Sequence, residues 1–157
     1  MDAQAAMAGS SLAFSRGCHP ACIACRDRAD GGLGLKFDTR ADGSVCAVFA
    51  CDTRFQGYPD RLHGGVVAML LDAAMTHCLF ARAVHGVAAR LAIRYHHPVD
   101  LGIPASVVAR PLRTVRHLYV LEAELHQEGL VRATAEASFF RYPDGRRWAE
   151  ARDPRLA

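Results

Sequence analysis

The chain has 157 residues, of which 51% are hydrophobic and 22% are charged, so it is expected to form one globular domain rather than a disordered segment. Its formal net charge of +3 argues against a general nucleic-acid binder and is compatible with an anionic small-molecule ligand. Of the 19 basic residues all except Lys36 are arginine, whose forked side chain suits phosphate, although a GC-rich genome also explains this bias.

The first 30 residues are expected to form an N-terminal lead and a cysteine-containing loop. Residues 1–17 carry no basic region and no sustained apolar core, so they do not resemble a signal peptide. Six cysteines in a chain without such a signal are typical of reduced thiols, which predicts a cytoplasmic location.

Three of these cysteines form a compact array. Cys18, Cys22 and Cys25 follow C-x3-C-x2-C spacing with His19 beside them, which matches the iron–sulfur motif of radical S-adenosylmethionine enzymes and supplies enough ligands for zinc. The chain is too short for the barrel that those enzymes need, and it has Ala24 where they usually carry an aromatic residue. We therefore interpret the cysteines as small apolar residues of a loop, with a zinc site as the alternative.

Apolar patterning predicts six strands and one helix within a domain at residues 31–142. Leu33, Leu35 and Phe37 alternate with smaller or polar residues and predict a strand that a turn joins to a second strand at 45–53. A loop rich in Gly, Pro and Asp leads into an apolar helix at 65–82. The remaining predicted segments are strands at 85–98, 105–113, 117–126 and 130–140, with a tight Glu-Gly turn before the last, and a loosely held tail at 143–157.

The order of these elements predicts an architecture. Connections after the helix are too short for parallel crossovers, so the sheet should be mainly antiparallel. One apolar sheet face and one apolar helix both need burial, which favours an α+β fold with a sheet of about six strands curled around one long central helix. Asp72, Thr76 and His77 interrupt the apolar run, so we expect no transmembrane helix and no membrane partner.

The segment FQGYPDRLHGGVVAMLLD at residues 55–72 has HGG opening the helix and an acid nine positions after the histidine. This arrangement resembles the hotdog-fold acyl-CoA thioesterase superfamily, most closely the branch with phenylacetate-pathway thioesterases and human thioesterase-superfamily proteins. IRYHHPVDLG after the helix and CIAC followed by GLGLKF also match that branch. The resemblance covers about residues 33–140, and it implies a homodimer paired through the strand at 87–95, or a tetramer of such dimers.

The resemblance also implies roles for single residues in hydrolysis of an acyl-CoA thioester. Asp72 falls at the catalytic carboxylate, Gly64 at the backbone N–H that polarises the thioester carbonyl, and His63 just before it. Gln56 falls one position from an amide that some relatives use beside that carbonyl. Thr76 matches a hydroxyl with which one branch orients the acid or the water.

Other relatives place Thr or Ser early in the next strand, where this chain has Ala88. For substrate binding, Gly65 permits close approach to the helix start, and Arg90 and Arg94 are candidates for the phosphates of coenzyme A. Solvated surface charge is the alternative role for both arginines. No cofactor and no metal is expected.

The spacing of Gly64 and Asp72 has its own consequence. Eight helical residues rise about 12 Å, so the two cannot act on one thioester carbon from the same chain. A two-fold axis would instead bring the helix start of one subunit near the helix middle of the other. Helix N-terminal amides stabilise an oxygen that gains negative charge, and Asp72 of the partner subunit would act as general base or nucleophile.

Two other functions stay open. Asp72 and His77 have the D-x4-H spacing of a hotdog enoyl-CoA hydratase, but the usual Asn-Pro is missing and five helical residues turn the two side chains about 140° apart. Ala88 suggests a non-catalytic acyl-CoA-binding protein. Structural roles are further alternatives, with His63 as a helix cap and Asp72 as a buried acid satisfied by Thr76.

Overall fold

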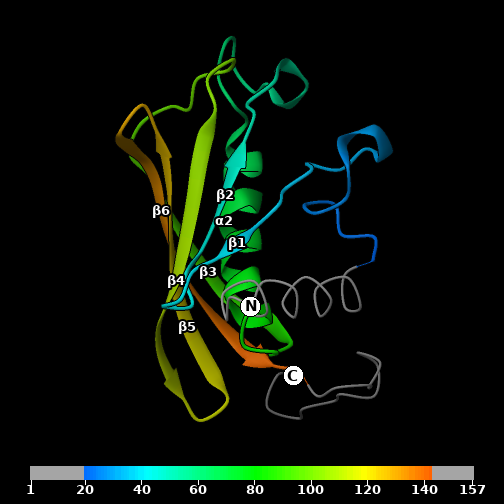
Figure 1. Ribbon diagram of the computed structural model, residues 1–157. Helices are drawn as coiled ribbons and strands as arrows, with labels where there is room; N and C mark the ends of the chain where they lie inside the picture. Colours follow the sequence, from blue (N-terminus) through cyan, green and yellow to red (C-terminus); the bar gives the residue numbers. More distant parts are fainter. Residues whose placement is uncertain (1–19, 143–157) are drawn as a thin grey trace.

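A computed structural model describes residues 20–142, which form one sheet packed against one α-helix (Figure 1). All six strands pair antiparallel in the spatial order β1-β2-β4-β5-β6-β3. The elements are β1 (Asp38–Thr39), β2 (Val45–Phe49), α2 (Gly64–Phe80), β3 (Gly86–Tyr95), β4 (Ala105–Val115), β5 (Leu118–Gln127) and β6 (Leu130–Arg141), with short 3-10 helices η1 (Arg28–Asp30) and η2 (Thr53–Phe55). The predicted α+β hotdog fold is confirmed.

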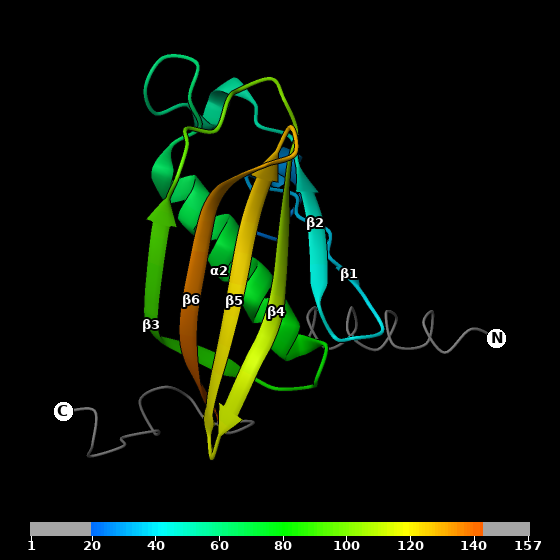
Figure 2. The same cartoon turned by 90° about the vertical axis from the view of Figure 1, so that its left-hand side faces the viewer.

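Helix α2 crosses one face of the sheet and lies mainly against β4 and β5 (Figure 2). Its residues are apolar on nearly every side, and Leu70, Leu71 and Met75 have no exposed surface. The alternating residues of β5 and β6 form the opposite wall of this core, as their period-2 pattern predicts. Burial of each large side chain contributes about 1.5–3 kcal/mol, which explains why a helix without a polar face forms here.

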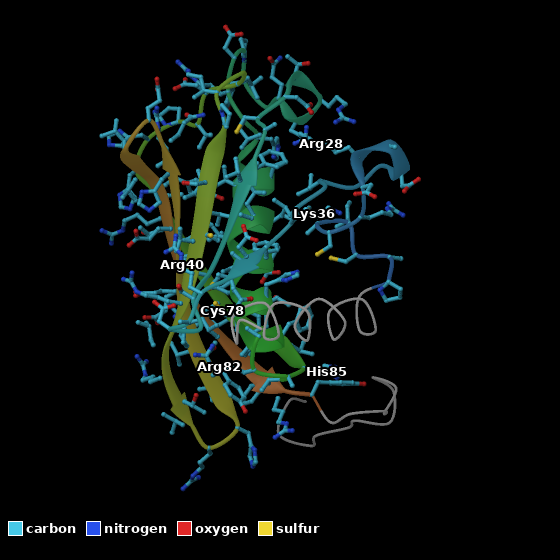
Figure 3. All side chains as sticks on the ribbon, viewed as in Figure 1. Arg28, Lys36, Arg40, Cys78, Arg82 and His85 are labelled. Carbon is cyan, nitrogen blue, oxygen red and sulfur yellow. The ribbon has the colours of Figure 1, made fainter. Side chains whose placement is uncertain are left out.

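The C-terminal end of α2 is closed by Arg82. One guanidinium nitrogen donates to the carbonyls of Cys78 and Gly43, both at 3.2 Å. Arg82 and Cys78 lie together at the lower end of the helix in Figure 3. The cation therefore sits at the negative end of the helix dipole and joins the helix to the β1–β2 turn. The helix accordingly ends at Phe80, two residues before the predicted boundary.

The first predicted strand is largely wrong. Strand β1 contains only Asp38–Thr39, although Leu33 and Leu35 are buried as their alternation predicts. The backbone N–H groups of Leu33 and Leu35 donate to Ile23 and Ala24 at 2.8 and 3.0 Å. This segment therefore pairs with the turn before it and not with the sheet.

Three β-bulges interrupt the sheet register. The pairing skips Ala89 on β3, Leu112 on β4 and Arg132 on β6, so each strand carries one extra residue. Bulges increase local twist and re-aim side chains, and they fit a sheet that curls around a helix.

The bulge in β3 overturns one prediction. The strict alternation of a regular strand predicts Ala88 on the same face as Arg90, but Ala88 pairs with the buried Phe139, whereas Arg90 pairs with Ser138. Because residues directly opposite each other share a face, Ala88 lies on the helix side of the sheet and Arg90 on the outer side. The extra residue at Ala89 causes this reversal.

The loop between β3 and β4 is fixed by one buried amide. Gln127 is 2% exposed, and its Oε1 accepts the Asp100 N–H at 2.9 Å. Its Nε2 donates to the carbonyls of Asp100 and Ile103, both at 2.8 Å. The Gln127 side chain thus satisfies three backbone groups of a loop that belongs to no strand of the sheet.

We expect Gln127→Met to lower the free energy of unfolding by about 1–3 kcal/mol, because it leaves three part-buried backbone groups of the 98–104 loop without their partner. Urea denaturation measures the change. Leu130→Met, at an exposed position of β6, is the control and should change stability by less than about 0.5 kcal/mol. Equal stability of the two variants would contradict the role given to Gln127.

Candidate functional site

The loop that leads into α2 is tied to the β3–β4 loop. The Leu62 N–H donates to the Val99 carbonyl at 2.8 Å. Arg61 forms an ion pair with the Asp100 carboxylate, and the two residues also form an isolated bridge. These contacts place the first turn of α2 at a fixed position beside the end of the sheet.

His63 caps the helix. Its Nδ1 accepts the Gly65 N–H at 2.9 Å, and its carbonyl accepts the N–H groups of Val66 and Val67 at 2.9 and 3.2 Å. Within residues 20–142 the Gly64 N–H makes no hydrogen bond. Three of the first helical N–H groups are therefore satisfied, and the exposed Gly64 amide remains available to a ligand at the positive end of the dipole.

The fold does not require a glycine at position 64. A Cβ added there would lie 3.7 Å from its nearest neighbour, an atom of Tyr95, which is ordinary contact. At Gly57, by contrast, a Cβ would come within 3.0 Å of the His63 Cα. Glycine is disfavoured in helices by up to about 1 kcal/mol relative to alanine. The bare backbone at Gly64 is thus better explained by close approach of something outside the chain.

Tyr95 touches the same point from β3. Its hydroxyl donates to the Gly64 carbonyl at 2.9 Å, and the side chain is 53% exposed. The last residue of the edge strand and the first residue of the helix therefore meet at the candidate site.

Asp72 lies midway along α2 and is half-buried, as are Met69 and Thr76 at helical spacing from it. These three residues follow one face of the helix, whereas Leu70 and Leu71 on other faces have no exposed surface. Helical rise separates Asp72 from Gly64 by about 12 Å, so one chain does not bring the two predicted groups together.

Gln56 and the two arginines lie elsewhere. Gln56 is exposed, and its Oε1 accepts the Asp60 N–H within the loop at 3.3 Å. Arg94 pairs with Thr134 in the register, and Arg90 lies 3.9 Å from Glu136. Both arginines are on the sheet face opposite α2, away from the helix start.

His77 belongs to a cluster on another side of α2. Its Nε2 lies 3.1 Å from the Cys25 Sγ. Its ring stacks on Phe37 with centroids 4.1 Å apart and meets Phe80 edge-on at 5.2 Å. These contacts pack the N-terminal cysteine turn onto the helix.

Burial, with a smaller contribution from Cys22, raises the pKa of Cys25 to about 12. Burial likewise raises the pKa of Cys78 to about 12. Both groups therefore remain neutral thiols at physiological pH. Because the folded chain keeps these protons longer than the unfolded chain, stability should fall as pH rises from 9.0 toward 12.

In residues 20–142 no three His, Cys, Asp or Glu side chains are arranged to hold a metal ion. Cys18 and His19 of the cysteine array lie outside the described residues. The same range contains no helix of sufficient length and apolar character to cross a membrane.

Comparison with known proteins agrees with this fold. The family description "Thioesterase superfamily" matches residues 60–134, which include the loop, α2 and most of the sheet. This part of the chain, residues 60–134, is therefore a thioesterase-superfamily segment, and it carries the hotdog fold. Comparison with curated protein sequences found no significant match.

Several solved structures are similar to this chain. The PaaI protein from the phenylacetic acid degradation operon of Escherichia coli is 15% identical, with a TM-score of 0.72 over 87% of this chain and 96% of that one. A thioesterase superfamily protein is 25% identical, with a TM-score of 0.67 over 70% of this chain, which spans 57% of that protein. A hypothetical thioesterase of Streptococcus pneumoniae with coenzyme A is 17% identical, with a TM-score of 0.65 over 69% and 85% of the two chains.

The cap is directly testable. His63→Ala should lower the free energy of unfolding by about 0.5–2 kcal/mol, because the Gly65 N–H loses its acceptor. His63→Asn, which can accept the same N–H, should retain most of the stability. Urea denaturation at pH 8 measures both variants. Equal losses in the two would show that the imidazole does not act as a cap.

Proposed function

We propose that this protein hydrolyses an acyl-CoA thioester to a free acid and coenzyme A in a site shared by two subunits. The Gly64 N–H would polarise the thioester carbonyl of the substrate. Asp72 of the partner subunit would activate water as general base or attack as nucleophile. The single observation that carries the proposal is the selective cap, which satisfies the next three N–H groups and leaves the N–H of the exposed residue Gly64 without a hydrogen bond within residues 20–142.

The edge strand supports a dimer. One side of β3 pairs with β6, while its other side has no partner in the described sheet. The strand has ten residues, and three of its large apolar side chains are exposed: Val87 at 38%, Leu91 at 38% and Tyr95 at 53%. A long edge with exposed apolar residues is a pairing surface. Pairing of two β3 strands would bring the α2 helices of two subunits side by side, in the arrangement that the 12 Å separation requires.

The thioesterase-superfamily match of residues 60–134 and the coenzyme A in the pneumococcal structure support the substrate class. His63 and Gly65 would support the Gly64 amide at the helix start. Thr76 would lie near Asp72, and Gln56 would contribute from the loop that precedes the helix. We propose no role in catalysis for His77, since Cys25, Phe37 and Phe80 occupy its surroundings. This packing weighs against the hydratase alternative.

One observation favours a second candidate, a non-catalytic acyl-CoA-binding protein. Ala88 lies on the helix side of β3, where some relatives have a hydroxyl, so this chain lacks one polar group on the face that meets the helix. Tight acyl-CoA binding without thiol release would select this function.

All five cysteines of the described residues, including Cys46 and Cys51, are free of disulfides. A reducing compartment fits this state, and we propose a cytoplasmic location.

Release of the coenzyme A thiol should be measured over short, long and aromatic acyl-CoA substrates. Asp72→Asn should lower kcat at least about 100-fold, because the amide cannot act as base or nucleophile. Circular dichroism checks folding, and Asp38→Asn, an exposed acid on β1, is the control. Thiol release by Asp72→Asn at the wild-type rate would contradict the assigned role.

Mixing of variants tests the shared site. Gly64→Ala should retain or raise the melting temperature but lower activity, and Asp72→Ala should be inactive alone. After subunit exchange each mixed dimer would contain one intact site, so a random equimolar mixture should recover about one quarter of wild-type activity. Mixed dimers confirmed by native mass spectrometry but without recovered activity would exclude a site built from both chains.

A further inference from the structure

The peptide unit between Gly64 and Gly65 is held at both ends by side chains. Its N–H donates to the His63 Nδ1 at 2.9 Å, and its carbonyl accepts the Tyr95 hydroxyl at 2.9 Å. Consecutive glycines have the largest backbone freedom of any dipeptide, and no side chain of their own restricts them. Beyond the hydrogen bonds of the helix itself, the orientation of this unit is restricted by the two side chains that contact it.

Tyr95 contributes little to the core. Its ring is 53% exposed at the end of β3, and its nearest atoms would lie 3.7–3.8 Å from a Cβ at Gly64. In its absence the exposed Gly64 carbonyl could bind water in place of the phenol. The hydrogen bond from Tyr95 is therefore suited to fix the direction of the Gly64 carbonyl rather than to stabilise the fold.

We propose that Tyr95 is a positioning residue of the hydrolytic site, and this inference rests on the proposed function. Its hydroxyl holds the Gly64 carbonyl. The Gly64 N–H lies in the neighbouring peptide unit, joined to this carbonyl through the Gly64 Cα, so the contact restricts rotation at Gly64 and keeps the N–H directed at the thioester oxygen. Amide donors stabilise a developing oxyanion only within a narrow range of distance and angle, and a displacement of about 1 Å can lower a rate 100-fold.

The position of Tyr95 in the sheet adds a second consequence. β3 is the strand through which we propose that two subunits pair, and Tyr95 is its last residue. A strand that pairs is held more firmly than a free edge. Dimer formation would therefore also order the phenol that orients the amide.

The test is Tyr95→Phe, which removes one oxygen and keeps the ring. We expect kcat to fall about tenfold while KM changes less than about twofold, because transition-state contact is lost and substrate binding is kept. The melting temperature should change by less than about 2 °C. Tyr58→Phe, at an exposed tyrosine of the preceding loop, is the matched control and should leave kcat unchanged.

A double-mutant cycle shows whether Tyr95 acts through Gly64. In the Gly64→Ala background, where a methyl group already obstructs the amide, Tyr95→Phe should lower kcat less than about twofold. A full tenfold loss in both backgrounds would overturn the positioning role. An unchanged kcat of Tyr95→Phe in an active wild-type background would also overturn it.

A measurement without turnover separates the two proposals. Nitrogen-15 relaxation of the Gly64 and Gly65 amides should show greater mobility in Tyr95→Phe than in wild type. Unchanged mobility would overturn the holding role of Tyr95. A wild-type protein that releases thiol from no acyl-CoA would overturn the proposed function, while the relaxation result would still decide the contact.

Discussion

The candidate site depends on the contacts of Asp100. Its backbone N–H and carbonyl are both bound by Gln127, at 2.9 and 2.8 Å, and its carboxylate is shared by Arg61 and by Arg132 at 3.2 Å. This residue therefore connects β5, β6 and the loop that enters α2. Together with the Leu62–Val99 hydrogen bond and the Tyr95 contact, these interactions give the cap and the Gly64 amide a defined place.

The proposed site takes its two chemical groups from two positions of one helix. The first turn of α2 supplies the Gly64 N–H, and the middle of α2 supplies the Asp72 carboxylate. The helix keeps these two groups about 12 Å apart. Because one helix cannot bring the two groups together, the proposed site can be completed only by the α2 helix of a second subunit. The unpaired side of β3 offers the surface on which such an arrangement could form.

Much of the fold could be predicted from the sequence because period-2 and continuous apolar patterns record burial directly. The proposed site residues Gly64 and Asp72 could be selected from their spacing and the family resemblance, but the contact of Tyr95 could not, since it joins residues 31 positions apart. The bulges were also invisible. Arg132 follows the polar alternation of β6, yet this extra residue is 9% exposed and its guanidinium binds the Pro98 carbonyl and the Asp100 carboxylate. Hydropathy carries no signal for one inserted residue, so neither the face of Ala88 nor the burial of Arg132 could be predicted.

The tight turn between β4 and β5, at residues 116–117, lies at the opposite end of the molecule from the start of α2 (Figure 1). Arg116 adopts a left-handed conformation with φ of 56° there, and both turn residues are exposed. Such a hairpin tip tolerates inserted chain better than any segment near the helix entrance. It therefore provides an attachment point for a fluorophore or a surface tether at the end of the molecule away from the start of α2.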